Sequence, residues 1–398
     1  MAAPAPNHRH QNRILSLAGE IEGWRKDLHR HPEVGFEEVR TAGIVAEKLR
    51  EFGVDEVREG VATTGVVGLI RGRGEGPCIG LRADMDALPM QERNGFEHAS
   101  TVPGKMHACG HDGHTAMLLG AAKILAETRD FDGTVALIFQ PAEEGGGGGR
   151  VMVEEGLFDM APCDSVWGLH NWPEMELGTF ASLSGGVMAG IDYFDIAVRG
   201  QGTHAGMPHQ GADTVLAAAH LVTAIQSVPG RSVNPHETAT IGVSMFRGSD
   251  AYVVMAEEAV IGGSVRYFDP ATRDLAERRI RTLAEGVADG FDCEAVVDYR
   301  KNYPPCVNPE AEAGVAAEVA EAVSGRAAVR EHEPCMAGED FSFMLNERPG
   351  NYIWMGSKSD DHASGRLHYP DYDFNDAAIP LGVGYWLALT DRLLGAGR

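Results

Sequence analysis

The chain has 398 residues, a length that suggests two or three domains at the usual ~150 residues each. Hydrophobic residues make up 43% and charged residues 23%, as in soluble globular proteins, so disorder along the whole chain is excluded. With 34 Lys+Arg against 58 Asp+Glu, the net charge of −24 argues against nucleic acid and against an anionic membrane surface as partners. An acidic substrate would need a local positive centre, such as a metal ion or an arginine.

The cysteines and the N-terminal residues bear on location. Six cysteines are spread along the chain without a CxxC pair, which favours reduced thiols over a disulfide scaffold. The first residues lack the basic stretch and apolar run of a secretory signal, and no run approaches the ~18 apolar residues of a membrane helix. We therefore expect a soluble, cytoplasmic protein that does not bind membranes.

The first half of the chain predicts helices that alternate with apolar strands. The expected elements are helices over 14–29, 38–52 and 115–128 and strands over 65–70, 78–83, 134–140 and 165–170. Near-continuous apolar runs are typical of strands that are buried on both faces. Because such strands alternate with helices here, we expect an α/β fold with a central mixed, largely parallel sheet flanked by helices.

The pattern changes after about residue 185. The elements expected next are strands over 193–200, 237–246, 258–268 and 293–300 and helices over 211–227 and 271–289. Their order, β-α-β-β-α-β, is that of a ferredoxin-like α+β unit. The alternating pattern of helices, strands and glycine-rich turns returns after Pro304-Pro305. We therefore predict one domain in two segments, 1–185 and 301–398, around an inserted domain, 186–300.

The segment MHACGHDGH (106–114) holds a possible pair of metal ligands. Cys109 and His111 are two residues apart, and in extended or loop backbone such residues project to the same side. A thiolate and an imidazole could thus converge on one ion. The alternative is a loop cysteine among capping or hydrogen-bonded histidines. His107 and His114 fit that alternative better, since at most one of them could join the ligands.

A pair of glutamates follows the strand over 134–140, in the segment QPAEEGGGGGR. Glu143 and Glu144 cannot both be buried and charged unless a cation lies beside them. The alternative is a solvated acidic turn in a flexible linker. The glutamate pair lies directly after a buried strand, which weakens that alternative, because open α/β sheets bind ligands at the carboxyl ends of their strands.

Two further strands end in polar residues. The strand over 78–83 leads into Asp84 and Asp86, and the strand over 165–170 ends at His170. Cys, His, Glu and Asp gathered at one sheet edge have no simple structural explanation, so we predict a metal site there. The candidate ligands exceed the four of one tetrahedral ion, which indicates two ions that share a bridging group.

Eight segments of the chain carry a family resemblance. They are DLHRHPEVGFEE (27–38), LRADMDALP (81–89), HACGHDGHTAMLL (107–119), FQPAEEGGGG (139–148), GLHNWP (168–173), GTHAGMPHQGAD (202–213), AGEDFSFML (337–345) and LHYPDYDFND (367–376). In this order they resemble the metal-dependent aminoacylases and hippurate hydrolases, including plant auxin-conjugate amidohydrolases, of the co-catalytic dimetal carboxypeptidase clan. The resemblance covers nearly the whole chain and implies a dimetal aminopeptidase-like catalytic domain.

The resemblance implies roles for residues of the catalytic domain. The implied metal ligands are Cys109, His111, Glu144, His170 and His368. Glu143 would be the general base, and Asp86 would orient a ligand. Asp84 stands where related carboxypeptidases carry a histidine ligand. Spacing alone could not have identified His368, whose loop is typical of an ordinary surface turn.

The resemblance also makes the inserted domain a lid and dimerisation domain. His204 would reach the substrate carbonyl from it, and Asn234 and Arg266 would help to hold the substrate carboxylate. The simpler alternatives are that Arg266 is a surface cation and that His209 lies next to a helix cap. The implied assembly is a homodimer or a dimer-based tetramer.

The expected function is hydrolysis of the amide bond of N-acyl amino acids, hippurate-like or N-acetyl-amino-acid-like, with two divalent ions per subunit. Thiolate and imidazole suit Zn, while carboxylate and imidazole with open positions also suit Mn, Co or Ni. One alternative is a dipeptidase or carboxypeptidase of the same clan. Another is a metal-binding protein without catalysis, which would have no use for Glu143.

Overall fold

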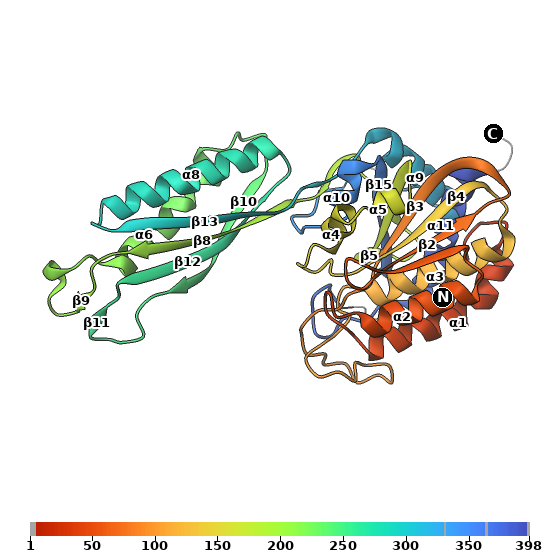
Figure 1. The fold of residues 1–398 in the computed structure, drawn as a ribbon, viewed down its shortest axis with the longest axis horizontal. Coiled ribbons are helices and arrows are strands. Elements are labelled where there is room, and N and C mark those ends of the chain that lie inside the picture. The colour runs from red at the N-terminus through yellow and green to blue at the C-terminus, as the bar shows by residue number, and fades with distance from the viewer. Residues whose placement is uncertain (1–4, 330–331, 363–364, 396–398) are drawn as a thin grey trace. The chain divides into compact units, whose positions relative to one another are not determined.

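The structure is a computed structural model that describes residues 5–329, 332–362 and 365–395 (Figure 1). It divides the chain into two units. Unit 1 comprises Met1–Val187, Val307–Glu333 and Asp340–Arg398, and unit 2 comprises Met188–Cys306 and Pro334–Glu339. The short segment Pro334–Glu339 groups with unit 2 although no sequence pattern indicated it. The paired strands β7 (Gly185–Met188) and β14 (Cys306–Asn308) lie where the chain passes between the units.

Unit 1 is built on a seven-stranded sheet with the order β1-β2-β4-β3-β5-β15-β6. Its strands are β1 (Glu56–Val61), β2 (Gly65–Arg71), β3 (Gly74–Asp84), β4 (Asp132–Gln140), β5 (Ser165–Glu176), β6 (Phe180–Ala181) and β15 (Gly350–Lys358). The central strands β4, β3, β5 and β15 are parallel, whereas β1, β2 and β6 pair antiparallel at the two sides. The predicted mixed, largely parallel α/β sheet is thus confirmed.

Both faces of this sheet are covered. Successive side chains of a strand point to opposite faces, yet β2, β4 and β15 are buried along nearly their whole length. Helices α3 (His111–Thr128) and α11 (Ile379–Leu394) pack against β3 and β4, and α1 (Gln11–Arg30) packs on both helices. The remaining helices of unit 1 are α2 (Val39–Glu51), α4 (Gly148–Glu154), α5 (Leu157–Met160), α9 (Glu310–Ser324), α10 (Ser342–Glu347) and the 3-10 turn η2 (Asp376–Ala378).

Unit 2 contains an antiparallel four-stranded sheet with the order β10-β12-β8-β13. Its elements are β8 (Gly190–Arg199), α6 (Thr214–Ile225), α7 (Ser227–Arg231), β10 (Ala239–Arg247), β12 (Glu258–Tyr267), α8 (Pro270–Asp289) and β13 (Glu294–Tyr303). Helices α6 and α8 pack against each other and against β12, so they cover one face of the sheet. Tyr193 and Val296 remain exposed on strands β8 and β13. The chain order β-α-β-β-α-β is the ferredoxin-like one.

Several local features differ from the sequence expectation. Helix α3 begins at His111 rather than at Thr115, because the backbone turns at Gly110 just before it. Strand β5 does not end at His170 but continues to Glu176, since it keeps pairing in parallel with the distant strand β15. Unit 2 also has a small antiparallel sheet of β9 (Thr203–His204) and β11 (Val254–Met255), and β9 is followed by the 3-10 turn η1 (Pro208–Gln210). The sequence did not predict these elements.

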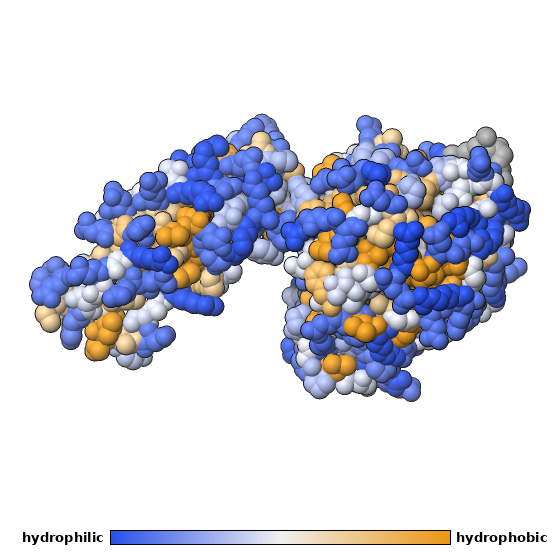
Figure 2. All heavy atoms as spheres, viewed as in Figure 1, coloured by the Kyte–Doolittle hydropathy of each residue, from blue (hydrophilic) through white to orange (hydrophobic). Residues whose placement is uncertain are grey.

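The surface is largely hydrophilic on the face that is drawn. Figure 2 shows a face on which hydrophilic residues predominate and hydrophobic ones form smaller areas. Among the helices of the described ranges, none combines the length and the apolar character that a membrane crossing requires.

Candidate active site

The predicted ligands of unit 1 gather at the carboxyl ends of parallel strands. Strand β3 ends at Asp84, which pairs with Gln140, the last residue of β4. Glu143 and Glu144 follow β4 directly, and His170 lies in β5 just beyond the stretch that pairs with β3. Because these strands run in one direction, their ends bring the side chains to one edge of the sheet, where open α/β sheets bind ligands.

Ligand atoms come together in overlapping groups. Those of Cys109, Glu144 and His368 all lie within 4.8 Å of one another, and so do those of His111, Glu143 and Glu144. The sulfur of Cys109 lies 3.4 Å from Nε2 of His170. Nε2 of His368 lies 3.0 Å from Oε1 of Glu144. The structure therefore brings all the ligands implied by the resemblance into one connected cluster.

The chemistry of His111 fits a metal ion. Its Nδ1 donates to the backbone oxygen of Asp86 at 2.9 Å, as metal-binding histidines commonly do through their second nitrogen. Its Nε2 is buried and has no hydrogen-bond partner among the described residues, although unsatisfied buried polar atoms are rare. Burial lowers the pKa of His111, but the Asp84 and Asp86 carboxylates outweigh it and raise the pKa to about 10. The carboxylates around this ring thus favour a positive charge beside it, and a divalent ion would supply that charge.

Cys109 leads to the same conclusion. Burial, together with the Glu144 and Glu143 carboxylates, raises the pKa of the Cys109 thiol well above its usual range. The thiol can lose its proton in this place only if a cation lies beside it. A metal ion that binds a cysteine has this effect, because it deprotonates the coordinating thiol. Burial and the neighbouring His114 keep the pKa of His170 well below its usual range, so that ring is neutral and can act as a ligand. These residues fit a divalent metal centre.

Asp86 holds the turn that carries the two glutamates. Its Oδ1 accepts the backbone N–H of Glu143 at 3.0 Å, and its Oδ2 accepts that of Glu144 at 2.9 Å. Oδ1 also lies 3.3 Å from Nδ1 of His111. Asp86 therefore contacts both the ring of His111, a candidate ligand, and the backbone of Glu143, the candidate general base. This is the geometry expected of a residue that orients others.

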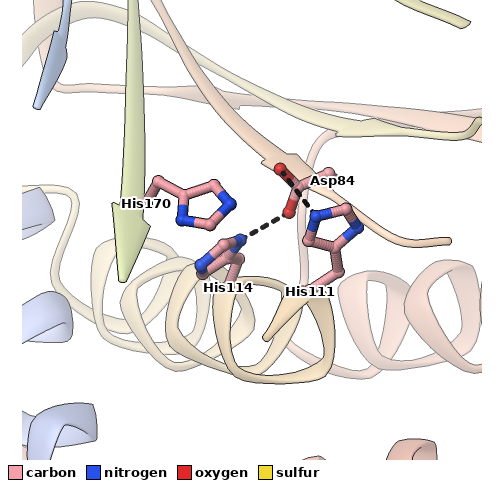
Figure 3. Close-up of side chains that lie close together, drawn as sticks. All are labelled: Asp84, His111, His114 and His170. Carbon is pink, nitrogen blue, oxygen red and sulfur yellow. Dashed lines mark hydrogen bonds and ion pairs between the residues drawn. The ribbon is translucent and has the colours of Figure 1, made fainter. Parts of the chain in front are cut away.

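Asp84 and His114 lie beside His111 and His170, as Figure 3 shows. Oδ1 of Asp84 lies 2.6 Å from Nδ1 of His114, and Oδ2 accepts from Nη1 of Arg82 at 2.7 Å. Although burial opposes it, the surrounding histidines and Arg82 hold the pKa of Asp84 well below its usual range. Nε2 of His114 lies 2.7 Å from Oδ1 of Asn171. With both ring nitrogens engaged, His114 is better suited to supporting the cluster than to coordinating an ion.

The backbone between Cys109 and His111 is not the extended path that the spacing argument assumed. Gly110 has φ of +93°, in the left-handed region, and His111 already belongs to α3. A Cβ at position 110 would lie 2.3 Å from Oδ1 of Asn171 and 2.7 Å from the hydroxyl of Tyr372. Only glycine fits this turn, and the turn, rather than strand alternation, brings the thiol and the imidazole to one cluster.

His107 and His368 lie in surroundings that their sequence spacing did not indicate. His107 is buried, and within the described part of the chain neither of its ring nitrogens has a hydrogen-bond partner. Burial lowers the pKa of His107 to about 4, so the ring is neutral. His368 has φ of +63°, and its N–H donates to the oxygen of Ala108 at 2.8 Å, which ties its loop to the Cys109 segment. That contact joins distant parts of the chain, and only the family resemblance had indicated His368 as a ligand.

His204 lies in unit 2, exposed on β9. Its Nδ1 accepts the N–H of Gly206 at 3.0 Å. Because Nδ1 is an acceptor, the proton of the neutral ring is on Nε2, which is left to donate to a ligand. The sequence had placed His204 in a glycine-rich turn, and the structure adds that it pairs with Val254 of β11.

The other two predicted substrate-binding residues also lie in unit 2. Arg266 is on strand β12, as expected, and its Nη1 donates to the oxygen of Met336 at 2.6 Å. Asn234 is exposed before β10, and its Oδ1 accepts the N–H of His236 at 3.2 Å. Within the residues that the structure describes, no hydrogen bond or ion pair joins His204, Asn234 and Arg266 to one another.

Comparison with known proteins places this geometry in a family. The profile of peptidase family M20/M25/M40 matches residues 80–392. The chain is 39% identical over 382 residues to the hippurate hydrolase of Campylobacter jejuni subsp. jejuni serotype O:2, covering 96% of this chain and 98% of that protein. It is 38% identical over 386 residues to the N-acetyl-L-cysteine deacetylase of Bacillus subtilis, covering 97% and 91%.

A solved structure gives the same result. The Bacillus subtilis YXEP protein, described as a dinuclear metal binding peptidase, superimposes with a TM-score of 0.82 at 31% identity. The match covers 94% of this chain and 98% of that one. These similarities confirm the resemblance that the sequence motifs indicated. The chain belongs to peptidase family M20/M25/M40.

Proposed function

We propose that this protein hydrolyses the amide bond of N-acyl amino acids, hippurate-like or N-acetyl-amino-acid-like, to a carboxylic acid and an amino acid. The observation that carries the proposal is the cluster, buried except at Glu144 and His368, in which Glu143 lies beside the candidate ligands. The hippurate hydrolase and the N-acetyl-L-cysteine deacetylase to which the chain is similar over nearly its whole length support this substrate class.

We propose two divalent ions per subunit, of Zn, Mn, Co or Ni. Their ligands would be Cys109, His111, Glu144, His170 and His368. When bound, the ions supply Lewis-acid chemistry that polarises the substrate carbonyl and lowers the pKa of a water to about 7. The dinuclear centre of the YXEP protein supports the number of ions, and the mixed donor set fits each of these metals.

The chain's own residues would move the proton and bind the developing charge. Glu143 accepts the proton of the attacking water on its carboxylate and delivers it to the leaving nitrogen. Asp86 holds the backbone of Glu143 so that the carboxylate keeps its direction. His204 donates from Nε2 to the carbonyl oxygen as it becomes an oxyanion, a contribution of about 10²–10³ in rate for one such donor. Asn234 and Arg266 bind the substrate carboxylate.

The assembly we propose is a homodimer or a dimer-based tetramer that associates through unit 2. Most of the large hydrophobic side chains that are exposed belong to this unit; they are Tyr193, Met207, Leu216, Phe246, Tyr252, Val253, Val254 and Val296. The edge strands β10 and β13 also offer backbone groups to another chain. The six free cysteines support a cytoplasmic location.

A substrate panel with metal analysis tests the proposed function. Protein purified without chelator is analysed for metal and then assayed with hippurate, N-acetyl amino acids, dipeptides and C-terminally extended peptides. Higher kcat/KM on N-acyl amino acids than on dipeptides supports the proposal, and the reverse order supports the dipeptidase or carboxypeptidase alternative. Bound metal without turnover of any of these amides would leave the non-catalytic alternative.

A further inference from the structure

A third buried carboxylate, Glu38, reaches the turn that carries the two glutamates. Its side chain is fully buried, and its Oε1 accepts the N–H of Ala142 at 2.9 Å. Its Oε2 accepts the hydroxyl of Thr64 at 2.6 Å. The N–H groups of Glu143 and Glu144 are bound by Asp86. Three successive amides of the turn are therefore held by two buried carboxylates, of which the mechanism so far uses one.

Capping of its own helix does not explain why Glu38 is buried. Glu38 stands at the N-terminal cap of α2, yet its side chain makes no capping hydrogen bond there. The N–H groups of Arg40 and Thr41 are instead bound by the Glu33 carboxylate at 3.0 and 2.8 Å. Burying a carboxylate is costly unless it binds something. The groups that Glu38 binds are the Thr64 hydroxyl and the backbone that leads into Glu143.

The turn needs an external constraint at this point. Ala142 has φ of +51°, a left-handed conformation that residues with a Cβ rarely adopt. The residues that follow, 145–149, are all glycine and leave the rest of the loop permissive. A Cβ added at Gly35 would lie 3.0 Å from the Cβ of Ala142, so the segment before Glu38 packs directly on the turn. A bound N–H at Ala142 fixes the peptide plane just before Glu143.

We propose that Glu38 is a positioning residue that orients the Glu143 carboxylate through the backbone of Ala142. The inference rests on the proposed function, because it takes Glu143 to be the general base. Glu38 would act on the proton-transfer step and on neither metal binding nor substrate affinity. Misplacing a catalytic group by about 1 Å can cost on the order of 10²-fold in rate, so loss of this contact should be visible in kcat.

The test compares Glu38→Met, which removes the acceptor at similar length, with Glu38→Gln, which keeps an acceptor oxygen. Glu38→Met should lower kcat by about 10–100-fold, with KM within about twofold of wild type and unchanged bound metal. Glu38→Gln should restore kcat to within about threefold of wild type, because its amide oxygen can accept the Ala142 N–H. The control is Glu37→Met: the Glu37 side chain is 64% exposed and pairs with Lys105 at 2.7 Å, so kcat should not change.

A double variant separates positioning from general structural damage. If Glu38 acts through Glu143, adding Glu38→Met to Glu143→Gln should cause no further loss of kcat, because the two residues act as one unit. A further loss equal to that of Glu38→Met alone overturns the inference. Three other results would also overturn the inference. They are wild-type kcat in Glu38→Met, equal loss of kcat in Glu38→Gln and Glu38→Met, and loss of bound metal along with activity.

Misfolding of Glu38→Met and failure of the proposed function can each be distinguished from failure of the inference. If Glu38→Met does not fold, Glu38→Asp decides. It keeps a carboxylate but shortens the side chain by one methylene, which takes the acceptor away from the Ala142 N–H, so it should lower kcat with metal retained. Wild-type kcat in Glu38→Asp overturns the inference. Failure of the proposed function is seen separately, as full kcat in Glu143→Gln or as absence of amide hydrolysis in the wild type. The inference alone fails when Glu143→Gln is slow and metal-loaded while Glu38→Met keeps wild-type kcat.

Discussion

The thiol sulfur of Cys109 lies 3.4 Å from Nε2 of His170, although 61 residues separate them in the chain. The first belongs to the loop before α3 and the second to strand β5, so the sheet and the helix that packs on it bring the two donors together. A soft thiolate and a neutral imidazole at this distance form one side of a metal site whose other side is made of carboxylates.

Glu143→Gln should leave the metal content near wild type and lower kcat by about 10²–10⁴, the usual contribution of a positioned general base. The reason is that only one glutamate of the pair is needed as a ligand, and Glu144 is the one that lies against His368. Metal analysis and steady-state kinetics on the same preparation check this. If the variant loses its metal instead, the roles of Glu143 and Glu144 are exchanged.

Cys109→Ser should weaken metal binding, because a hydroxyl is much harder to deprotonate beside a metal than a thiol. Activity should return in part with excess Mn, which accepts oxygen ligands. Cys306→Ser is the control, since Cys306 is a buried cysteine outside the candidate ligands. Full metal occupancy and normal activity of Cys109→Ser in ordinary buffer would remove Cys109 from the ligand set.

Gly110→Ala should lower both metal content and activity. The added Cβ would lie 2.3 Å from Oδ1 of Asn171, and the φ of +93° is itself unfavourable for alanine. Gly104→Ala is a matched control, because Gly104 has φ of +76° but nothing within 4 Å of an added Cβ. That control carries the backbone strain without the collision and should keep its metal. Equal loss of metal in both variants would contradict the steric explanation.

Much of this arrangement could be predicted from local patterns. The helical and alternating periods predicted the α/β sheet, and the polar residues that end buried strands indicated which edge would carry the site. Asp84, Glu143 and His170 lie at that edge, because parallel strands place their carboxyl ends together.

What could not be predicted depends on contacts between distant segments. The extension of β5 beyond His170 needs strand β15 beside it, and nothing in the residues around His170 signals that partner. The need for glycine at position 110 depends on Asn171 and Tyr372, distant residues that lie where a Cβ would stand. The hydrogen bond of Glu38 to Ala142 likewise joins segments 104 residues apart, so spacing alone could not have assigned Glu38 a role.

Stability should fall as the pH rises because of His29. Its Nδ1 lies 2.8 Å from Asp112 and its Nε2 lies 3.2 Å from Glu92, all within the buried interior of unit 1. Burial lowers the pKa of His29, but the two carboxylates outweigh it and raise the pKa from 6.5 to about 9. The folded state therefore keeps a proton that the unfolded state releases first as the pH rises. The stabilisation is complete below pH 6.5 and is lost as the pH passes about 9.

The size of this contribution is on the order of 3 kcal/mol, from the pKa difference between the two states. Urea unfolding at about pH 6 and about pH 9 should show a marked loss of stability in the wild type and a much smaller one in His29→Gln. His31→Gln, whose side chain is 39% exposed, should behave as the wild type does. Parallel curves for the wild type and His29→Gln would contradict the assignment.

His204 could serve the active site of its own chain or that of a neighbouring subunit. We predict that His204 acts in trans across a two-fold dimer formed through unit 2. His204→Ala subunits and Glu143→Ala subunits, each inactive alone, are mixed under conditions that allow exchange. In trans, each mixed dimer has one site with both defects and one site with none. Random pairing makes half of the dimers mixed, so about a quarter of wild-type activity should return.

The alternative arrangements give a different result. If His204 serves the site of its own chain, or if the protein is a monomer, every site keeps one defect and no activity returns. Exchange is monitored independently, by native mass spectrometry of subunits that differ in a tag, so that absence of activity can be interpreted. A mixture that exchanges its subunits and stays inactive rules out the trans arrangement. Glu143 remains the proposed base in that case, because its role does not depend on which subunit contributes His204.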